Sequence, residues 1–341
     1  MYRVLILFIS LFCCCSFLHA QKAQWQIQNS GVETSIRGAS AVDENICWLG
    51  TKGCVLRTVD GGKSWQKLTI AGADSLDFRD VAAFDKDTCI AMSAGPGTES
   101  RIYKTTDGGR NWKMVRENAH HKGFYNGMAF WDNRVGLLAG DPIAGVPYLL
   151  KTTDAGETWE EIPGENMPPL MEGEYGFAAS GTHIATVGNQ VAFIGTGGST
   201  ARIFHTTDQG KSWQVVNTPM ISGEASQGIF SIAFSDEQFG MAVGGDYTKE
   251  NEGKNNVMFT ENGGKSWHLV NTVRLDYRSC IAMTPGVILV AGPSGTEISY
   301  DDGKSFKSIS DQGFHTLAVS PDGKGIWAAG AVGVVGRLKM K

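Results

Sequence analysis

The side chains of this sequence that could carry out chemistry together are carboxylates, arginines and tyrosines. Paired carboxylates cleave glycosidic bonds as acid and base or as acid and nucleophile. The candidates for such a pair are Asp141, Glu174 and Asp246. Tyr277 is a further candidate nucleophile. Arginines hold a carboxylate through two parallel hydrogen bonds. The arginines that could act in this way are Arg37, Arg79 and Arg278. The residue types therefore indicate glycan cleavage or the recognition of an anionic or polyhydroxylated ligand.

The elements that must position these residues follow from an internal repeat. One eight-residue pattern occurs six times, from TVDGGKSW at 58–65 to SYDDGKSF at 299–306. Each copy has a hydroxyl residue first, an acid or amide third, a Gly fifth and an aromatic residue last. The acid or amide positions are Asp60, Asp107, Asp154, Asp208, Asn262 and Asp301. Their spacing of 39 to 54 residues indicates one supersecondary unit per copy.

The chemistry of this motif is that of a hairpin turn. An Asp or Asn side chain accepts hydrogen bonds from backbone N–H groups just after it, and a Gly can adopt positive φ. The aromatic residue can anchor the turn against the sheet. Six equivalent carboxylates distributed around a molecule do not converge on one substrate, so we interpret them as structural rather than catalytic.

The repeat predicts an all-β fold. Each unit contains four short strand-like runs separated by Gly-rich turns, which is typical of one propeller blade. The last unit, 314–338, has only three such runs, and the segment beginning at Trp25 can supply the fourth. The prediction is a seven-bladed β-propeller with four-stranded antiparallel blades, closed by the N-terminal strand joining the last blade. Residues 21–341 would form this single domain.

The six motifs resemble Asp-box repeats, also called BNR repeats. With Gly-Gly-Lys-Ser-Trp recurring after third strands, the chain is most similar to the photosystem II stability/assembly factor family. Related Asp-box propellers include sialidases, xyloglucan-cleaving glycoside hydrolases and the sortilin ectodomain. The resemblance implies the seven-bladed fold and an exported scaffold that assists assembly. The motif specifies blade architecture and not activity.

In such a blade the Asp boxes mark one face, here called the bottom. The starts of the first strands and the ends of the second strands then lie near the axis on the opposite, top face. We predict that the binding residues are Arg37, Arg79, Tyr125, Asn126, Asp141, Glu174, Asp246, Tyr247, Arg278 and His315. Phe230 also begins a first strand. Long connections at 163–175, 217–228 and 246–256 indicate an asymmetric cleft on this face.

Two functions remain open from the sequence. The first is an exported non-catalytic propeller that binds a protein or glycan partner through the top-face cleft. The second is a glycan-cleaving enzyme, either a glycoside hydrolase or a polysaccharide lyase. Sialidase activity is disfavoured because seven blades are predicted and Arg37 is not followed by Ile-Pro. No nucleophile-elbow, zinc-protease, phosphate-loop or dinucleotide motif is present, and we expect neither a cofactor nor a metal.

Composition and the N-terminus bear on location and partners. Lys+Arg 30 against Asp+Glu 35 gives a net charge of -5, which disfavours nucleic-acid binding. Arg3 followed by the apolar run 4–18 predicts an export signal over 1–20, hence a periplasmic or secreted protein without a membrane span after removal of the signal. The alternatives are an uncleaved anchor and a lipid attached to one of Cys13, Cys14 and Cys15. Cys47 and Cys54 either bridge one hairpin or are buried free thiols. We expect a monomer.

Overall fold

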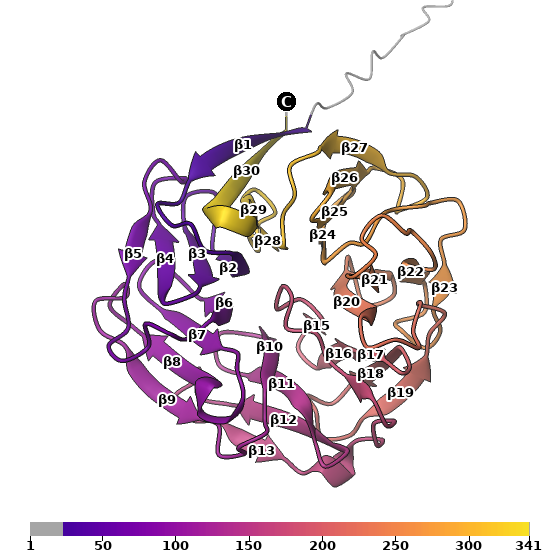
Figure 1. Ribbon diagram of the computed structural model, residues 1–341, viewed down its shortest axis with the longest axis horizontal. Helices are drawn as coiled ribbons and strands as arrows, with labels where there is room; N and C mark the ends of the chain where they lie inside the picture. Colours follow the sequence, from indigo (N-terminus) through magenta and orange to yellow (C-terminus); the bar gives the residue numbers. More distant parts are fainter. Residues whose placement is uncertain (1–22, 341) are drawn as a thin grey trace, which may run out of the picture.

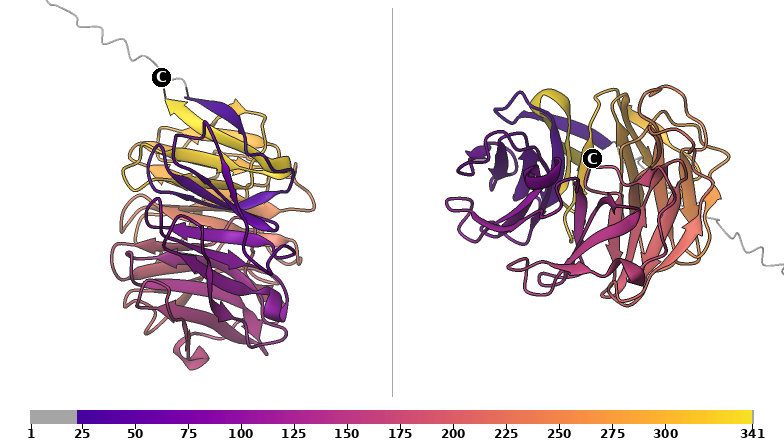
Figure 2. Two further views of the ribbon diagram at one scale, coloured as in Figure 1. Left: turned by 90° about the vertical axis from the view of Figure 1, so that its left-hand side faces the viewer. Right: turned by 60° about the horizontal axis from the view of Figure 1, so that its bottom comes forward.

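The computed structural model describes residues 23–340, so the predicted export signal and the cysteines at 13–15 lie outside the described residues. Seven antiparallel sheets are arranged around a central axis (Figure 1). Seen from the side, the strands run between the two faces of the ring, so the turns gather on those faces (Figure 2). No helix among residues 23–340 is long and apolar enough to cross a membrane.

The first four blades follow the order of the chain. Blade 1 contains β2 (Ile36–Ala41), β3 (Cys47–Thr51), β4 (Cys54–Thr58) and β5 (Gln66–Leu68). Blade 2 contains β6 (Phe78–Ala83), β7 (Cys89–Ser93), β8 (Arg101–Thr105) and β9 (Lys113–Glu117). Blade 3 contains β10 (Tyr125–Phe130), β11 (Gly136–Ile143), β12 (Val146–Thr152) and β13 (Glu160–Ile162). Blade 4 contains β15 (Ile184–Val187), β16 (Val191–Gly195), β18 (Arg202–Thr206) and β19 (Gln214–Asn217).

The remaining blades complete the ring. Blade 5 contains β20 (Gln227–Phe234), β21 (Gly240–Asp246), β22 (Val257–Thr260) and β23 (His268–Leu269). Two short strands, β14 (Glu174–Tyr175) and β17 (Gly197–Gly198), extend the sheet of blade 5 beyond β20. Blade 6 contains β24 (Cys280–Thr284), β25 (Val287–Gly292), β26 (Gly295–Ser299) and β27 (Lys307–Ser310). Blade 7 contains β28 (Thr316–Val319), β29 (Ile326–Ala329), β30 (Val334–Met340) and β1 (Ala23–Asn29). Single 3₁₀ turns lie at Gly97–Glu99, Gly164–Asn166 and Ala331–Gly333.

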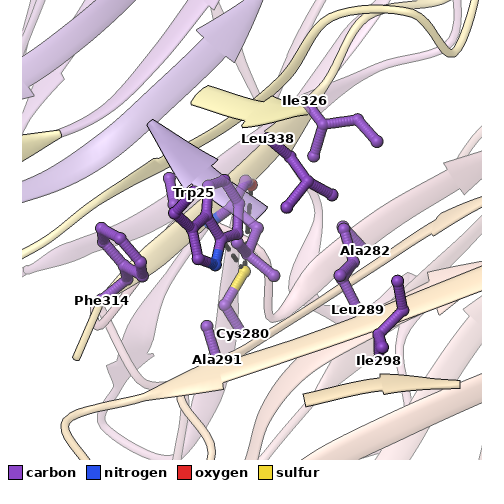
Figure 3. Packing of buried hydrophobic residues seen from close by; sticks show 11 residues of the cluster. Trp25, Cys280, Ala282, Leu289, Ala291, Ile298, Phe314, Ile326 and Leu338 are labelled. Atoms are coloured by element: carbon purple, nitrogen blue, oxygen red, sulfur yellow. Dashed lines mark hydrogen bonds between the residues drawn. The ribbon is translucent and has the colours of Figure 1, made fainter. Parts of the chain in front are cut away.

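The N-terminal strand closes the ring, which confirms the predicted fold. β1 pairs antiparallel with β30 along its whole length, from Ala23 opposite Met340 to Asn29 opposite Val334. Trp25 packs on Phe314 with ring centroids 5.1 Å apart. Figure 3 shows this cluster, in which apolar side chains of blade 6 and blade 7 share one core. This pairing gives blade 7 its fourth strand and covers the edge of β30.

The core of the molecule lies between neighbouring blades. Each apolar cluster combines residues of adjacent sheets, as where Leu49 of blade 1 meets Trp327 of blade 7. The first strands of neighbouring blades contact one another around the whole ring, so they form its inner wall. The four cysteines of the described chain are buried free thiols, and Cys47 and Cys54 are not bridged. Free cysteines in a protein core pack like small apolar residues, which agrees with the burial of these four.

The Asp boxes form one recurrent hydrogen-bonded turn. In blade 1 the Thr58 hydroxyl accepts the Gly62 N–H at 2.9 Å and donates to Asp60 at 2.9 Å. Asp60 also accepts the Ser64 N–H at 3.0 Å and the Ser64 hydroxyl at 2.6 Å. These donors lower the pKa of Asp60 to about 2, with the Ser64 side chain first among them. The Asp60 and Thr58 side chains therefore hold the turn together from within.

Candidate pocket at the axis of the top face

A pocket of about 390 Å³ opens where the inner strands meet on the top face. Three lining residues lie in the inner strands β2, β6 and β20, and the others lie in the connections before blades 4, 6 and 7 and in connections within blades 5 and 6. We call it the top pocket, and it is lined by Arg37, Arg79, Phe177, Ala178, Ala179, Phe230, Tyr247, Glu250, Tyr277, Ser279, Pro293 and His315.

β-Bulges direct several of these side chains toward the axis. The pairing of β2 with β3 shifts register around Arg37, and that of β6 with β7 shifts around Arg79. Equivalent shifts occur in β10 around Asn126 and in β20 around Phe230. A bulge leaves one residue unpaired and re-aims its side chain. The same irregularity near the start of four inner strands therefore turns four side chains out of the regular pleat.

Arg37 is the least compensated charge of the pocket. Its guanidinium donates one hydrogen bond, at 3.4 Å, to the carbonyl of Ala179, and within the described chain no carboxylate forms an ion pair with it. Burial and the neighbouring Arg79 lower the pKa of Arg37. Arg79 instead pairs with Asp77 at 2.7 Å. The nearby Asp77 opposes this pKa shift but forms no ion pair with Arg37, and a mostly buried guanidinium without a direct carboxylate partner favours binding of an anionic group beside it.

Aromatic rings line the side of the pocket across from the arginines. Phe177 stacks on Phe230 with centroids 3.9 Å apart. Tyr247 meets both rings edge-on at 6.4 and 6.1 Å, and Tyr277 meets Phe230 edge-on at 4.9 Å. Tyr247 is about half exposed (48%), whereas Tyr277 is buried. The pocket thus has a cationic side and an apolar aromatic side.

The floor of the pocket is a segment that crosses the ring axis. We call residues 177–183, between β14 and β15, the axial segment; its loop reaches the middle of the ring in Figure 1. The carbonyls of Ala178 and Ala179 accept hydrogen bonds from Arg79 and Arg37. The Ser180 hydroxyl donates to the Ser279 carbonyl at 3.0 Å, and Thr316 donates to the Ser180 carbonyl at 3.2 Å. The axial segment therefore fixes the arginines from below.

A buried titratable group, the Asp80 carboxyl, lies against the axial segment. It is fully enclosed and accepts the N–H groups of Val81 at 2.8 Å and Met128 at 2.7 Å. Burial raises the pKa of Asp80 well above its usual range. Gly181 lies against this carboxyl at positive φ, and a Cβ at that position would stand 2.6 Å from Asp80. A glycine is therefore needed for the axial segment to pass.

The structure brings together part of the predicted site. Four predicted binding residues, Arg37, Arg79, Tyr247 and His315, line the top pocket, together with Tyr277, the candidate nucleophile. The other predicted residues do not line it. Tyr125 is buried beside Tyr148, and Asn126 donates to Asp141 at 2.8 Å. Arg278 is buried in an ion pair with Glu297.

The three candidate carboxylates are not gathered in the pocket, and each is held by other groups. Glu174 is fully buried against Arg202. Asp246 accepts the Thr248 hydroxyl at 2.7 Å, and despite its burial its hydrogen bonds lower its pKa to about 2. Burial raises the pKa of Asp141. Burial also raises the pKa of the Tyr277 phenol, which keeps the phenol protonated and disfavours it as a nucleophile.

Sequence reasoning missed the axial segment, whereas Glu250 lies in the connection 246–256 that was predicted to border the cleft. The predicted loop ended at Tyr175, although the small residues that follow it, FAASGTH at 177–183, are a signal for a chain that must pass a narrow space. Among the described residues no group of three or more His, Cys, Asp or Glu side chains could hold a metal ion.

A buried histidine beneath the pocket makes the fold sensitive to acid. His183 is fully buried, neither ring nitrogen has a hydrogen-bond partner within residues 23–340, and burial lowers its pKa from 6.5 to about 4. The unfolded chain takes up a proton near pH 6.5, whereas the folded protein resists protonation until about pH 4. Stability present above pH 6.5 is therefore lost as the pH falls toward 4, by about 3 kcal/mol for this residue.

Urea unfolding at pH 7 and pH 4.5 measures this effect. We expect His183→Gln to lose less stability between the two pH values than the wild type, because glutamine does not titrate there. His121→Gln, at an exposed position, is the control and should keep the wild-type pH dependence. An unchanged pH dependence in His183→Gln would show that His183 does not carry the effect.

Comparisons with known proteins show the fold and a partial family match. Residues 95–221 match the family model described as photosynthesis system II assembly factor YCF48. No curated protein matches the chain. The structure of YCF48 bound to D1 peptide is 18% identical with a TM-score of 0.63, and covers 92% of this chain and 96% of that chain. YCF48 from Cyanidioschyzon merolae is 16% identical with a TM-score of 0.63, covering 92% and 98%.

A carbohydrate-active propeller is similar as well. The GH74 xyloglucanase from Xanthomonas campestris is 15% identical with a TM-score of 0.62, and covers 92% of this chain but only 53% of that chain. At these identities the likeness shows the fold and not the activity. The chain is therefore a seven-bladed Asp-box propeller, similar in fold to YCF48 and to one part of a GH74 xyloglucanase, whose residues 95–221 match the YCF48 family model.

Proposed function

We propose that this protein is a non-catalytic scaffold that binds an acidic segment of a protein partner in the top pocket. The observation that carries the proposal is Arg37, a largely buried guanidinium with no carboxylate partner in the described chain, beside Arg79. A carboxylate of the partner would compensate this charge. The aromatic rings of Phe230 and Tyr247 would receive the apolar part of the same segment.

The comparisons support a protein as the partner. A YCF48 propeller has been solved with a D1 peptide bound, so a propeller of this fold can hold a peptide. By analogy we propose a role in assembling or stabilising a larger protein, outside the cytoplasm if the segment 1–20 directs export. A glycan with an acidic group is the competing ligand, because rings and arginines also suit a sugar acid.

Glycan cleavage is the second candidate, supported by the GH74 likeness and the aromatic side of the pocket. It needs two carboxylates about 5–10 Å apart on either side of the bond. Glu250 is the one carboxylate among the residues that line the top pocket. We therefore expect no new reducing or unsaturated ends from acidic and neutral glycans. Turnover that is lost in Glu250→Gln would overturn the non-catalytic proposal.

A peptide titration tests the binding proposal. Fluorescently labelled peptides with clustered Asp and Glu, and matched peptides with Asn and Gln, are titrated with the purified protein. We expect Arg37→Ala to weaken binding of the acidic peptides about 10- to 100-fold, because a charge-assisted hydrogen bond contributes about 1.5–3 kcal/mol. Lys307→Ala, an exposed position on the outer strand β27, is the matched control and should bind like the wild type. Equal binding of neutral peptides, or unchanged binding by Arg37→Ala, would contradict the proposal.

A further inference from the structure

The residue that precedes the first Ser or Thr of each Asp box lies at the seam between two blades. In blades 1 to 3 this residue is a cation that reaches the next blade. Arg57 donates to the carbonyl of Lys86 at 2.7 Å, and Lys104 pairs with Glu157 at 2.7 Å. Lys151 donates to the carbonyl of Gln209 at 2.7 Å. A long cationic side chain thus fills each of these three seams.

Blade 5 departs from this pattern. Its equivalent residue is Phe259 in β22, at the right of Figure 1, whereas blade 4 has His205 and blade 6 the buried Ile298. Asp302 of blade 6 occupies the same place in its Asp box as Gln209 does in blade 4, and both have positive φ. Phe259 cannot donate a hydrogen bond to the Asp302 carbonyl as Lys151 does to that of Gln209.

A groove of about 600 Å³ lies at this seam. We call it the seam groove, and its apolar lining consists of Phe239, Phe259, Leu269 and Val270, all partly exposed. The opposite side is the Asp box of blade 6 at 302–304. The Thr272 hydroxyl donates to the Lys304 carbonyl at 2.9 Å and joins the two sides. The groove therefore has defined walls, and its apolar surface is open to solvent.

The rim of the seam groove is mainly acidic. Asp236, Glu261 and Asp302 are exposed there, against one exposed cation, Lys304. The backbone N–H groups of Phe239 and Gln238 lower the pKa of Asp236, so it is ionised at neutral pH. An apolar floor inside an acidic rim is complementary to an apolar side chain with basic neighbours.

We propose that the seam groove binds a short segment of a partner protein that has an apolar anchor flanked by Lys or Arg. The anchor would lie on Phe259 and Leu269, and the basic residues would meet Asp236, Glu261 and Asp302. The groove borders the Asp-box turn of blade 6, and it shares no lining residue with the top pocket. This inference is therefore independent of the binding site proposed above, and one partner could engage both.

Two matched probe peptides test the proposal. One is a capped, fluorescein-labelled hexapeptide with two central leucines flanked on both sides by lysines, and the other has glutamates in place of the lysines. Anisotropy with the purified protein should show saturable binding of the lysine peptide at millimolar concentration or below, and weaker binding of the glutamate peptide. Absence of saturable lysine-peptide binding, or equal binding of both peptides, would overturn the proposal.

Variants assign the binding to the seam groove. Phe259→Lys places in blade 5 the residue type that fills the seam in blade 3, and should weaken lysine-peptide binding at least about tenfold. Phe259→Leu keeps the apolar surface and should bind within a few-fold of the wild type. Glu261→Lys alters only the exposed rim, so it should weaken the lysine peptide and strengthen the glutamate peptide even if Phe259→Lys fails to fold.

Two further measurements separate the remaining explanations. Arg37→Ala should bind the lysine peptide like the wild type, which distinguishes this groove from the top pocket. Sedimentation of the protein alone tests whether a second copy of the chain occupies the groove. Self-association that is abolished by Phe259→Lys would replace the proposed partner segment with a copy of this protein and overturn the proposal.

Discussion

Glu174→Ala is expected to lower the free energy of unfolding by about 3–5 kcal/mol, because it leaves a buried guanidinium without its anion. The Glu174 side chain is 0% exposed and that of its partner Arg202 is 5% exposed. Arg202 Nε lies 3.0 Å from both carboxylate oxygens. The carboxylate also accepts the Thr196 hydroxyl at 2.6 Å and the Met171 N–H at 2.9 Å.

Chemical unfolding at pH 7 measures this loss. Glu252→Ala is the matched control, since Glu252 belongs to an exposed pair with Lys249 at 3.9 Å and should change stability by less than about 1 kcal/mol. Wild-type stability of Glu174→Ala would contradict the structural role. That result would return Glu174 to the candidate carboxylates for glycan cleavage.

Trp159→Ala in the Asp box of blade 3 is expected to cost about 3–5 kcal/mol, because it removes a large buried side chain. Trp159 is 3% exposed and meets Phe130 edge-on at 5.9 Å in the apolar core between blades 2 and 3. Trp112, at the same place in blade 2, is only partly buried. Trp112→Ala should therefore cost clearly less.

The two tryptophan variants form a matched comparison within one motif. Both remove the same side chain from equivalent turns, so the difference between their unfolding free energies reports burial and not the motif itself. Equal losses in the two variants would indicate that the aromatic position acts through the turn rather than through the core. Wild-type stability of Trp159→Ala would contradict the anchoring role altogether.

The fold could be predicted from the sequence because local and global signals agree. The Asp box determines a turn through side chains within eight residues, its six copies give six blades, and the strand-like runs of the last unit give the seventh. The last unit lacks a fourth strand, and Trp25 resembles the aromatic residues that end the Asp boxes. These two features predicted the ring closure, which the pairing of β1 with β30 confirms. None of these signals needs knowledge of contacts between distant residues.

The site could be predicted only in part, because burial and partners depend on distant segments. The positions of Arg37 and Arg79 follow from the start of each inner strand, although the bulges that turn them inward leave no mark in the sequence. Arg278 occupies an equivalent position, but Glu297 on β26 neutralises it. Sequence spacing gives no sign of such a pairing.

The axial segment was missed for a similar reason. Its hydrogen-bond partners belong to blades 1, 2, 5, 6 and 7, and the segment precedes blade 4 in the chain. Only the assembled ring shows that Ala178 and Ala179 form the floor of the pocket. The central residues of the segment, 178–181, are small and carry no motif, so their type indicates narrow space but does not show where the segment lies.

The central claim, that a protein partner binds in the top pocket, is tested most directly by photo-crosslinking in the cells that make this protein. A benzoylphenylalanine is placed at the half-exposed position Tyr247, and a control at Val59, 45% exposed in the Asp box of blade 1. The proposal predicts a protein adduct from position 247 that disappears in Arg37→Ala and does not form from position 59. An adduct from position 247 that persists in Arg37→Ala, or the same adduct from position 59, would contradict it.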